Sequence, residues 1–215
     1  SLPNMFRRFF AEGAFNTAFV PMFSKKLEAG ENPLGFARDA FSGLASLLIA
    51  LTLVAQLAMP WFVLAMAGGF AGDVRLELAV DLGRVAFGYI LFISLAALVS
   101  GLLNATGRFA AAAAAPILLN LILIGALVLA ESGLLAGATI AVDTETDAAL
   151  TGLHHGTLMV WSILLAGIAQ LVWVWIMAAR IGFRLVPHWP RLTPDMRKLA
   201  VIMLPAMLAA GVVQI

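Results

Sequence analysis

The sequence predicts an all-α, polytopic membrane helical bundle, and three observations lead to this fold class. Apolar residues make up 62% of the 215 residues and charged residues only 12%, whereas a typical soluble domain is about half apolar and a quarter charged. Long stretches contain no charged residue. These stretches are continuous rather than alternating, which favours helices over the strands of a membrane barrel. The composition excludes both an ordinary soluble domain and a disordered chain.

Four charge-free stretches are long enough to cross a bilayer. A spanning helix needs about 20 mostly apolar residues, and these stretches contain 33, 23, 22 and 32 residues. A fifth stretch of 17 residues follows Lys198, and a sixth apolar segment, Leu2–Phe23, carries Arg7, Arg8 and Glu12. We therefore expect about six transmembrane segments, near residues 1–23, 36–67, 76–105, 109–131, 156–181 and 196–215.

Basic residues in the connecting loops predict the orientation, because cytoplasmic loops carry an excess of Lys and Arg. One set of alternate loops holds nine basic residues and the other set only two. We expect the loops 24–35 and 182–194 to be cytoplasmic and the loop 132–153 to be extracytoplasmic. The nine are Lys25, Lys26, Arg38, Arg108, Arg180, Arg184, Arg191, Arg197 and Lys198, and the two are Arg75 and Arg84.

Several functional classes lack support in the sequence. The chain has no cysteine, and its net charge of +1 gives no nucleic-acid signature. Phosphate-binding glycine loops and nucleophile motifs do not stand out, so we expect neither an enzyme nor a cofactor. Asp143, Glu145, Asp147, His154 and His155 gather in one polar region, but their spacing defines no ligand geometry, and we interpret the region as a solvated acidic loop without a metal.

The most informative segment contains Asn4, Arg7, Arg8 and Glu12. A charge inside a membrane costs at least about 2.5 kcal/mol, so it usually faces a cavity or a partner. One interpretation is that both arginines reach to the interface and Arg8 pairs with Glu12, four residues away. The other is that Arg7 lines a water-filled cavity and binds an anion, because guanidinium makes bidentate bonds to phosphate. The residues alone leave both interpretations open.

Three motifs resemble one family in the family's own order. The string LPNMFRRFFAEGAF at Leu2–Phe15 resembles the second transmembrane helix of the MurJ/MviN family, the lipid II flippases of the MOP exporter superfamily. The string LNATGRF at Leu103–Phe109, followed by APILLN at 115–120, resembles the turn between the fourth and fifth helices. The string LPAM at 204–207, with Gln214, resembles the seventh helix.

The resemblance implies that this chain is an internal fragment covering about helices two to seven, within the N-terminal lobe of a fourteen-helix transporter with a central cationic cavity. Arg7 then aligns with a cavity arginine, and Asn4, Arg8 and Glu12 belong to the same motif as candidate substrate-binding residues. The sequence also departs from the family. The string GFARD at 35–39 resembles a motif of the family's first helix, yet it follows the Leu-Pro-Asn segment instead of preceding it.

The implied function is movement of the lipid-linked peptidoglycan precursor, lipid II, from the inner to the outer leaflet of the bacterial cytoplasmic membrane by alternating access. The partners would be lipid II and membrane lipids, with no nucleic acid, and the full-length protein would be monomeric. Two alternatives stay open. The first is another exporter of the superfamily for a polyprenyl-linked saccharide, and the second is a non-transporting membrane scaffold of cell-wall assembly.

Overall fold

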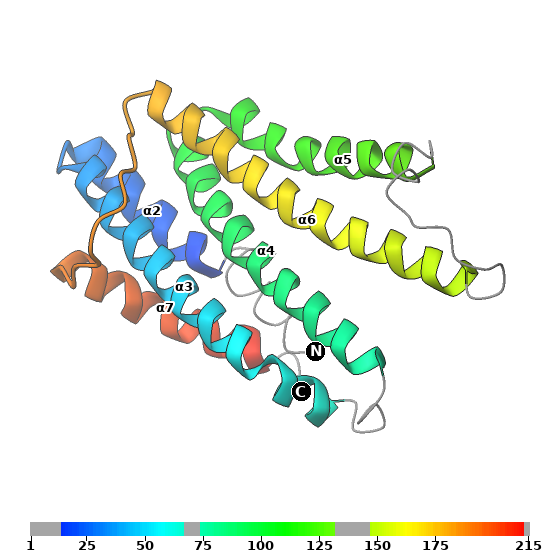
Figure 1. The fold of residues 1–215 in the computed structure, drawn as a ribbon. Coiled ribbons are helices and arrows are strands. Elements are labelled where there is room, and N and C mark those ends of the chain that lie inside the picture. The colour runs from blue at the N-terminus through cyan, green and yellow to red at the C-terminus, as the bar shows by residue number, and fades with distance from the viewer. Residues whose placement is uncertain (1–13, 67–73, 132–146, 213–215) are drawn as a thin grey trace.

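The computed structural model describes residues 14–66, 74–131 and 147–212 (Figure 1). Every secondary-structure element in these ranges is a helix, which confirms the predicted all-α class. The helices are α2 (Ala14–Ala29), α3 (Pro33–Met66), α4 (Val74–Ala105), α5 (Phe109–Glu131), α6 (Asp147–Arg180) and α7 (Pro194–Val212).

Four of the described helices are long and apolar enough to cross a membrane. Large apolar side chains cover their outer surfaces, as Leu57 shows with 79% of its area exposed. Such surfaces are stable in lipid, where apolar exposure has no cost. The predicted first and last spans, 1–23 and 196–215, extend beyond the described residues and stay predictions. The four candidate spans are Pro33–Trp61, Val80–Ala105, Phe109–Leu129 and Val160–Arg180.

The connection between α2 and α3 is much shorter than the loop predicted at 24–35. The chain turns within three residues, where Gly30 and Asn32 adopt left-handed conformations with φ of 67° and 47°. The Asn32 side-chain oxygen accepts a hydrogen bond from the Gly35 amide at 3.0 Å and thereby caps α3. The charged residues around Lys25 are good helix formers, so α2 continues through them.

Helix α6 also begins earlier than the span predicted at 156–181. It starts at Asp147, where a carboxylate is favourable because it lies near the positive end of the helix dipole. The polar residues between Asp147 and position 156 therefore belong to the helix rather than to the loop. This region carries His154 and His155, which the sequence suggests as part of an acidic loop.

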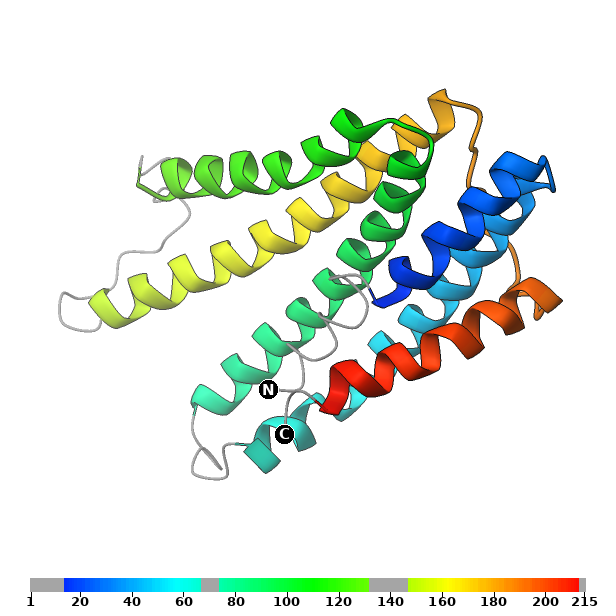
Figure 2. The ribbon, with the colours of Figure 1, turned by 180° about the vertical axis from the view of Figure 1, so that it is seen from behind.

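Close approach between helices fixes the arrangement around α4. Figures 1 and 2 show α5 and α6 side by side, α4 crossing next to them, and α2, α3 and α7 grouped on the other side of α4. A Cβ atom at Gly167 of α6 would lie only 2.9 Å from the Tyr89 ring of α4. The alanines at 110–115 keep α5 close to α6, where Trp173 donates from Nε1 to the Ala111 carbonyl at 2.9 Å.

Three connections rich in basic residues lie at one end of the bundle. The Arg38 Nε at the start of α3 donates to the carbonyl of Arg184, beyond α6, at 2.8 Å. Arg108, in the α4–α5 turn, lines the same groove as Arg180, the last residue of α6. Packing therefore collects at one end the basic residues that the sequence distributes over alternate loops. Which side of the membrane this end faces stays a prediction.

We predict that this end faces the cytoplasm, because basic loops are retained on that side. The chain contains no cysteine, so single cysteines can be introduced into a cysteine-free full-length protein. Ala138→Cys should react with a membrane-impermeant thiol reagent in intact cells. Val186→Cys, at an exposed position of the α6–α7 connection, should react only after membrane disruption. The reverse pattern would contradict the proposed orientation.

Candidate functional site

The four sequence-predicted site residues Asn4, Arg7, Arg8 and Glu12 lie at positions outside the described residues. The chain that follows them is described, because it forms α2, Ala14–Ala29. The position and rotation of α2 therefore determine the setting in which this motif acts. The contacts of α2 are the part of the candidate site that can be built from the structure.

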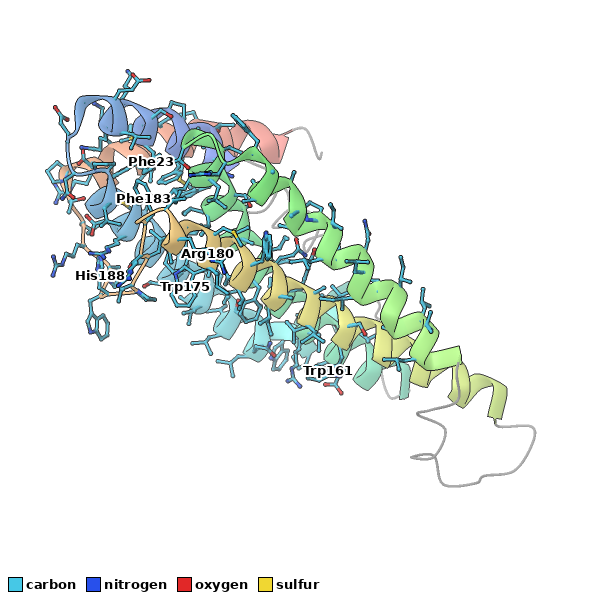
Figure 3. All side chains as sticks on the ribbon, turned by 90° about the horizontal axis from the view of Figure 1, so that it is seen from above. Phe23, Trp161, Trp175, Arg180, Phe183 and His188 are labelled. Carbon is cyan, nitrogen blue, oxygen red and sulfur yellow. The ribbon has the colours of Figure 1, made fainter. Side chains whose placement is uncertain are left out.

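One face of α2 is fixed by stacked phenylalanine rings. Phe15, Phe19 and Phe23 are at most 5% exposed, and the centroid of the Phe19 ring lies 5.9 Å from that of Phe15 and 5.5 Å from that of Phe23. Phe36 of α3 stacks on Phe19 at 5.6 Å, and Phe183 beyond α6 meets Phe23 edge-on at 5.5 Å (Figure 3). Rotating α2 would break all four ring contacts, each worth about 0.5–1.5 kcal/mol beyond burial.

A second contact ties α2 to α4. The Asn16 Nδ2 donates to the Ala97 carbonyl at 2.7 Å. The two helices come this close because α4 has Gly101 at the crossing, where a Cβ atom would lie 2.9 Å from Asn16 Oδ1 and 3.0 Å from a methyl group of Val20. Asn16 did not stand out in the sequence, although a single amide among apolar helix residues is a signal for an interhelical contact.

A third contact ties α2 to α7. The Lys26 Nζ lies 2.9 Å from the carboxylate of Asp195, and the side chain of Lys26 is only 17% exposed. The same ammonium lies 5.8 Å from the centroid of the Phe36 ring. This partly buried ion pair positions the beginning of α7 next to the end of α2.

The GFARD string at 35–39, which departs from the family order, has a structural role here. Besides the Arg38–Arg184 bond, the Asp39 carboxylate lies 3.2 Å from His188 Nε2. The His188 backbone amide donates to the Ser42 hydroxyl at 3.1 Å. These contacts fasten the α6–α7 connection to the first turns of α3 (Figure 3). The sequence did not reveal this role, because the partners lie 146 residues apart.

Two grooves with polar residues lie away from α2. One, of about 570 Å³, lies between α4 and α6 and is lined by Gln56 and Arg84. These two residues bond each other, through Gln56 Nε2 to the Arg84 carbonyl at 3.0 Å and Arg84 Nε to the Gln56 carbonyl at 3.3 Å. The other, of about 430 Å³, lies between α4 and α5 and includes Gln170, which is 2% exposed.

A metal centre has no support in the described ranges. Within residues 14–66, 74–131 and 147–212, no group of three or more His, Cys, Asp or Glu side chains is placed to hold a metal ion. The predicted acidic loop extends over Asp143 and Glu145, which lie outside these ranges.

Comparison with known proteins identifies the family. Residues 1–215 match the sequence model of the family described as "Lipid II flippase MurJ". This chain belongs to that family. The protein named "Probable lipid II flippase MurJ" from Rhizobium tropici is 41% identical over 217 residues, which cover 99% of this chain and 38% of the relative. The protein of the same name from Rhizobium meliloti (strain 1021) is 40% identical over 218 residues, which cover 100% and 38%.

A further relative carries the same family name. The "Lipid II flippase MurJ" from Burkholderia cenocepacia is 42% identical over 130 residues, which cover 59% of this chain and 25% of the relative. The chain spans 38% of the length of each Rhizobium relative. The family and the four apolar helices establish a multi-pass protein of the bacterial inner membrane. The resemblance to MurJ drawn from the sequence motifs is thereby confirmed.

The Lys26–Asp195 pair provides a test of how α2 is held. Lys26→Glu in the full-length protein places two carboxylates together, and we expect it to destabilise the fold by about 1 kcal/mol or more, because the pair is only partly exposed. Adding Asp195→Lys should restore most of the lost thermal stability in detergent. Lys25→Glu is the matched control, because Lys25 is exposed. Equal losses for Lys25→Glu and Lys26→Glu would contradict a specific pair.

Proposed function

We propose that the full-length protein is a lipid II flippase, and that this chain supplies part of the lobe that handles the pyrophosphate of the substrate. The observation that carries the proposal is the match of all 215 residues to the family, which includes the segment with Arg7. The Rhizobium and Burkholderia relatives are named as lipid II flippases.

The physical task of such a protein explains why arginine is placed in a membrane helix. A pyrophosphate and a polar headgroup cannot cross hydrocarbon unaided, because buried charges and unpaired polar groups are costly. Guanidinium groups replace the lost hydration of the phosphates through charge-assisted, bidentate hydrogen bonds. Transport requires binding and release without covalent chemistry, so the family is a transporter family rather than one of catalysts.

Helical periodicity gives Arg7 and Arg8 different environments. We infer that α2 extends upstream through the motif as one helix, at 3.6 residues per turn. Arg7 then lies about three turns before Ala18 and five turns before Lys25, on the line where the packed face of α2 meets its exposed face. Ala18 is 3% exposed, whereas Lys25 is exposed.

Arg8 falls on a different line of the same helix. It lies about three turns before Phe19, and Glu12 lies about two turns before Phe19, in the centre of the packed face. Four residues separate Arg8 from Glu12, so the two can pair within this face. Asn4 lies about three turns before Phe15, at the border of the packed face. We therefore assign phosphate binding to Arg7 first, with Asn4, Arg8 and Glu12 supporting the same site.

The contacts of α2 suit alternating access. Stacked rings, the Asn16–Ala97 bond and the Lys26–Asp195 pair hold α2 against α3, α4 and α7. A lobe held in this way can rock as one body against the rest of the protein around a fixed site. The polyprenyl tail would stay in the lipid during the movement. We propose that the full-length protein acts as a monomer with lipid II and membrane lipids as its partners.

Arg7→Ala in the full-length protein should abolish lipid II flipping while its abundance in the membrane stays near that of the wild type. Arg7→Lys should restore activity only partly, because an ammonium keeps the charge but loses the planar fork. The measurement is growth of cells depleted of their native flippase, with protein abundance determined in parallel.

Arg8→Ala is the matched control and should have a milder effect, because Arg8 lies on the packed line and pairs with Glu12. Full growth supported by Arg7→Ala would contradict the phosphate-binding role and would favour a non-transporting scaffold. Normal transport of a different polyprenyl-linked saccharide without lipid II transport would favour another exporter of the superfamily.

A further inference from the structure

A groove of about 450 Å³ lies where the α4–α5 turn meets the end of α6. We call it the turn groove. Two arginines and four apolar side chains carry the argument below. They are Leu103, Arg108, Phe109, Met177, Arg180 and Ile181.

The backbone of the turn holds Arg108 in place. Gly107 adopts a left-handed conformation with φ of 77°, and the Arg108 amide donates to the Leu103 carbonyl at 2.8 Å. The Ala112 amide donates to the Arg108 carbonyl at 3.3 Å, so Arg108 is the N-cap residue of α5. The bond from Trp173 to the Ala111 carbonyl then fixes this first turn of α5 against α6.

The second arginine comes from α6. Arg180 is the last residue of that helix (Figure 3), and both Arg108 and Arg180 are exposed. No ion pair involving either arginine occurs in the part of the chain that the structure describes. Two carboxylates at this end already have cationic or imidazole neighbours, since Asp195 pairs with Lys26 and Asp39 with His188. The turn groove therefore carries two positive charges that are available to an anion.

The remaining walls are apolar and lead toward lipid. Leu103 is fully buried at the base of the groove, whereas Phe109 is 65% exposed at its edge. Further along α5, Leu121 and Ile124 are 60% and 57% exposed. A molecule with a phosphate and an acyl chain could place the phosphate between the arginines and the chain along α5.

We propose that the turn groove binds the phosphate headgroup of an anionic phospholipid from the membrane leaflet on this side. Charge complementarity supports a phosphate, because basic pockets between helices at the membrane surface attract anionic lipids. Apolar walls beside the charges support a lipid rather than a free anion. The site is separate from the phosphate-binding role proposed for Arg7, and it depends on the membrane location of the chain rather than on the transported substrate.

Lipid binding to the purified full-length protein in detergent tests the proposal. Phosphatidylglycerol and phosphatidylethanolamine are titrated separately, and the bound fraction is measured by native mass spectrometry. The double variant Arg108→Gln/Arg180→Gln should bind phosphatidylglycerol about tenfold more weakly than the wild type, because each basic residue near a membrane surface contributes to anionic lipid binding. Phosphatidylethanolamine, with no net charge, should bind more weakly than phosphatidylglycerol.

The matched control is Arg191→Gln/Arg197→Gln. It removes the same charge from exposed positions at the same end of the bundle, outside the turn groove, and should keep wild-type binding. All variants are exposed substitutions, and thermal unfolding verifies that each is folded. Millimolar inorganic phosphate should not displace the lipid.

Four outcomes would overturn the proposal. They are unchanged binding by the Arg108→Gln/Arg180→Gln variant, an equal loss in the control, equal binding of both lipids, and displacement by inorganic phosphate. The last would identify a site for a free anion instead of a lipid. Because none of these measurements involves transport, failure of the lipid site and failure of the proposed flippase function are distinguishable.

Discussion

The ring of Phe19 is the contact on which the arrangement of the first part of the bundle depends. It is fully buried and stacks on Phe15 and Phe23 of its own helix and on Phe36 of α3. In a membrane, helices gain little from leaving lipid, so packing and specific contacts between side chains must hold them together. The stack supplies such packing and fixes the rotation of α2. The direction of every residue upstream on the same helix follows from that rotation.

Small residues allow the second group of helices to pack equally closely. Gly101 lets α2 approach α4, and Gly167 lets α6 approach the Tyr89 ring. The alanines at 110–115 have the same effect between α5 and α6, and the Trp173–Ala111 bond sets the register of these two helices. Because α4 contacts helices on both of its sides, it couples the α2, α3 and α7 group to the α5 and α6 group.

Polar side chains inside the described helices mainly bind backbone carbonyls of other helices or of their own helix. Asn16 reaches across to Ala97, Gln56 to Arg84, and the Ser94 hydroxyl to Ile90 of the same helix at 2.6 Å. Each bond satisfies a polar group where lipid offers no partner. Such bonds also make the lobe stiff, which is a requirement for moving it as one body in alternating access.

The sequence by itself determined the helical class, because charge-free stretches of 22 residues or more leave the backbone no other way to satisfy its hydrogen bonds in a bilayer. It also singled out Arg7 and its neighbours, since charges within an apolar segment are costly without a function. The exact helix ends were harder to predict. Gly30 and Asn32 place the α2–α3 turn through local backbone conformation, whereas the loop prediction followed charge alone.

Only the tertiary structure decided which distant residues meet. Asn16 and Ala97 are 81 residues apart, and Arg38 and Arg184 are 146 residues apart. Arg108 and Arg180 each count as one basic residue in a loop when the sequence is considered, yet they line one groove. Periodicity describes one helix at a time, and it contains no information on which face of another helix packs against it. The closeness of the packing at Gly101 and Gly167 supplies that information.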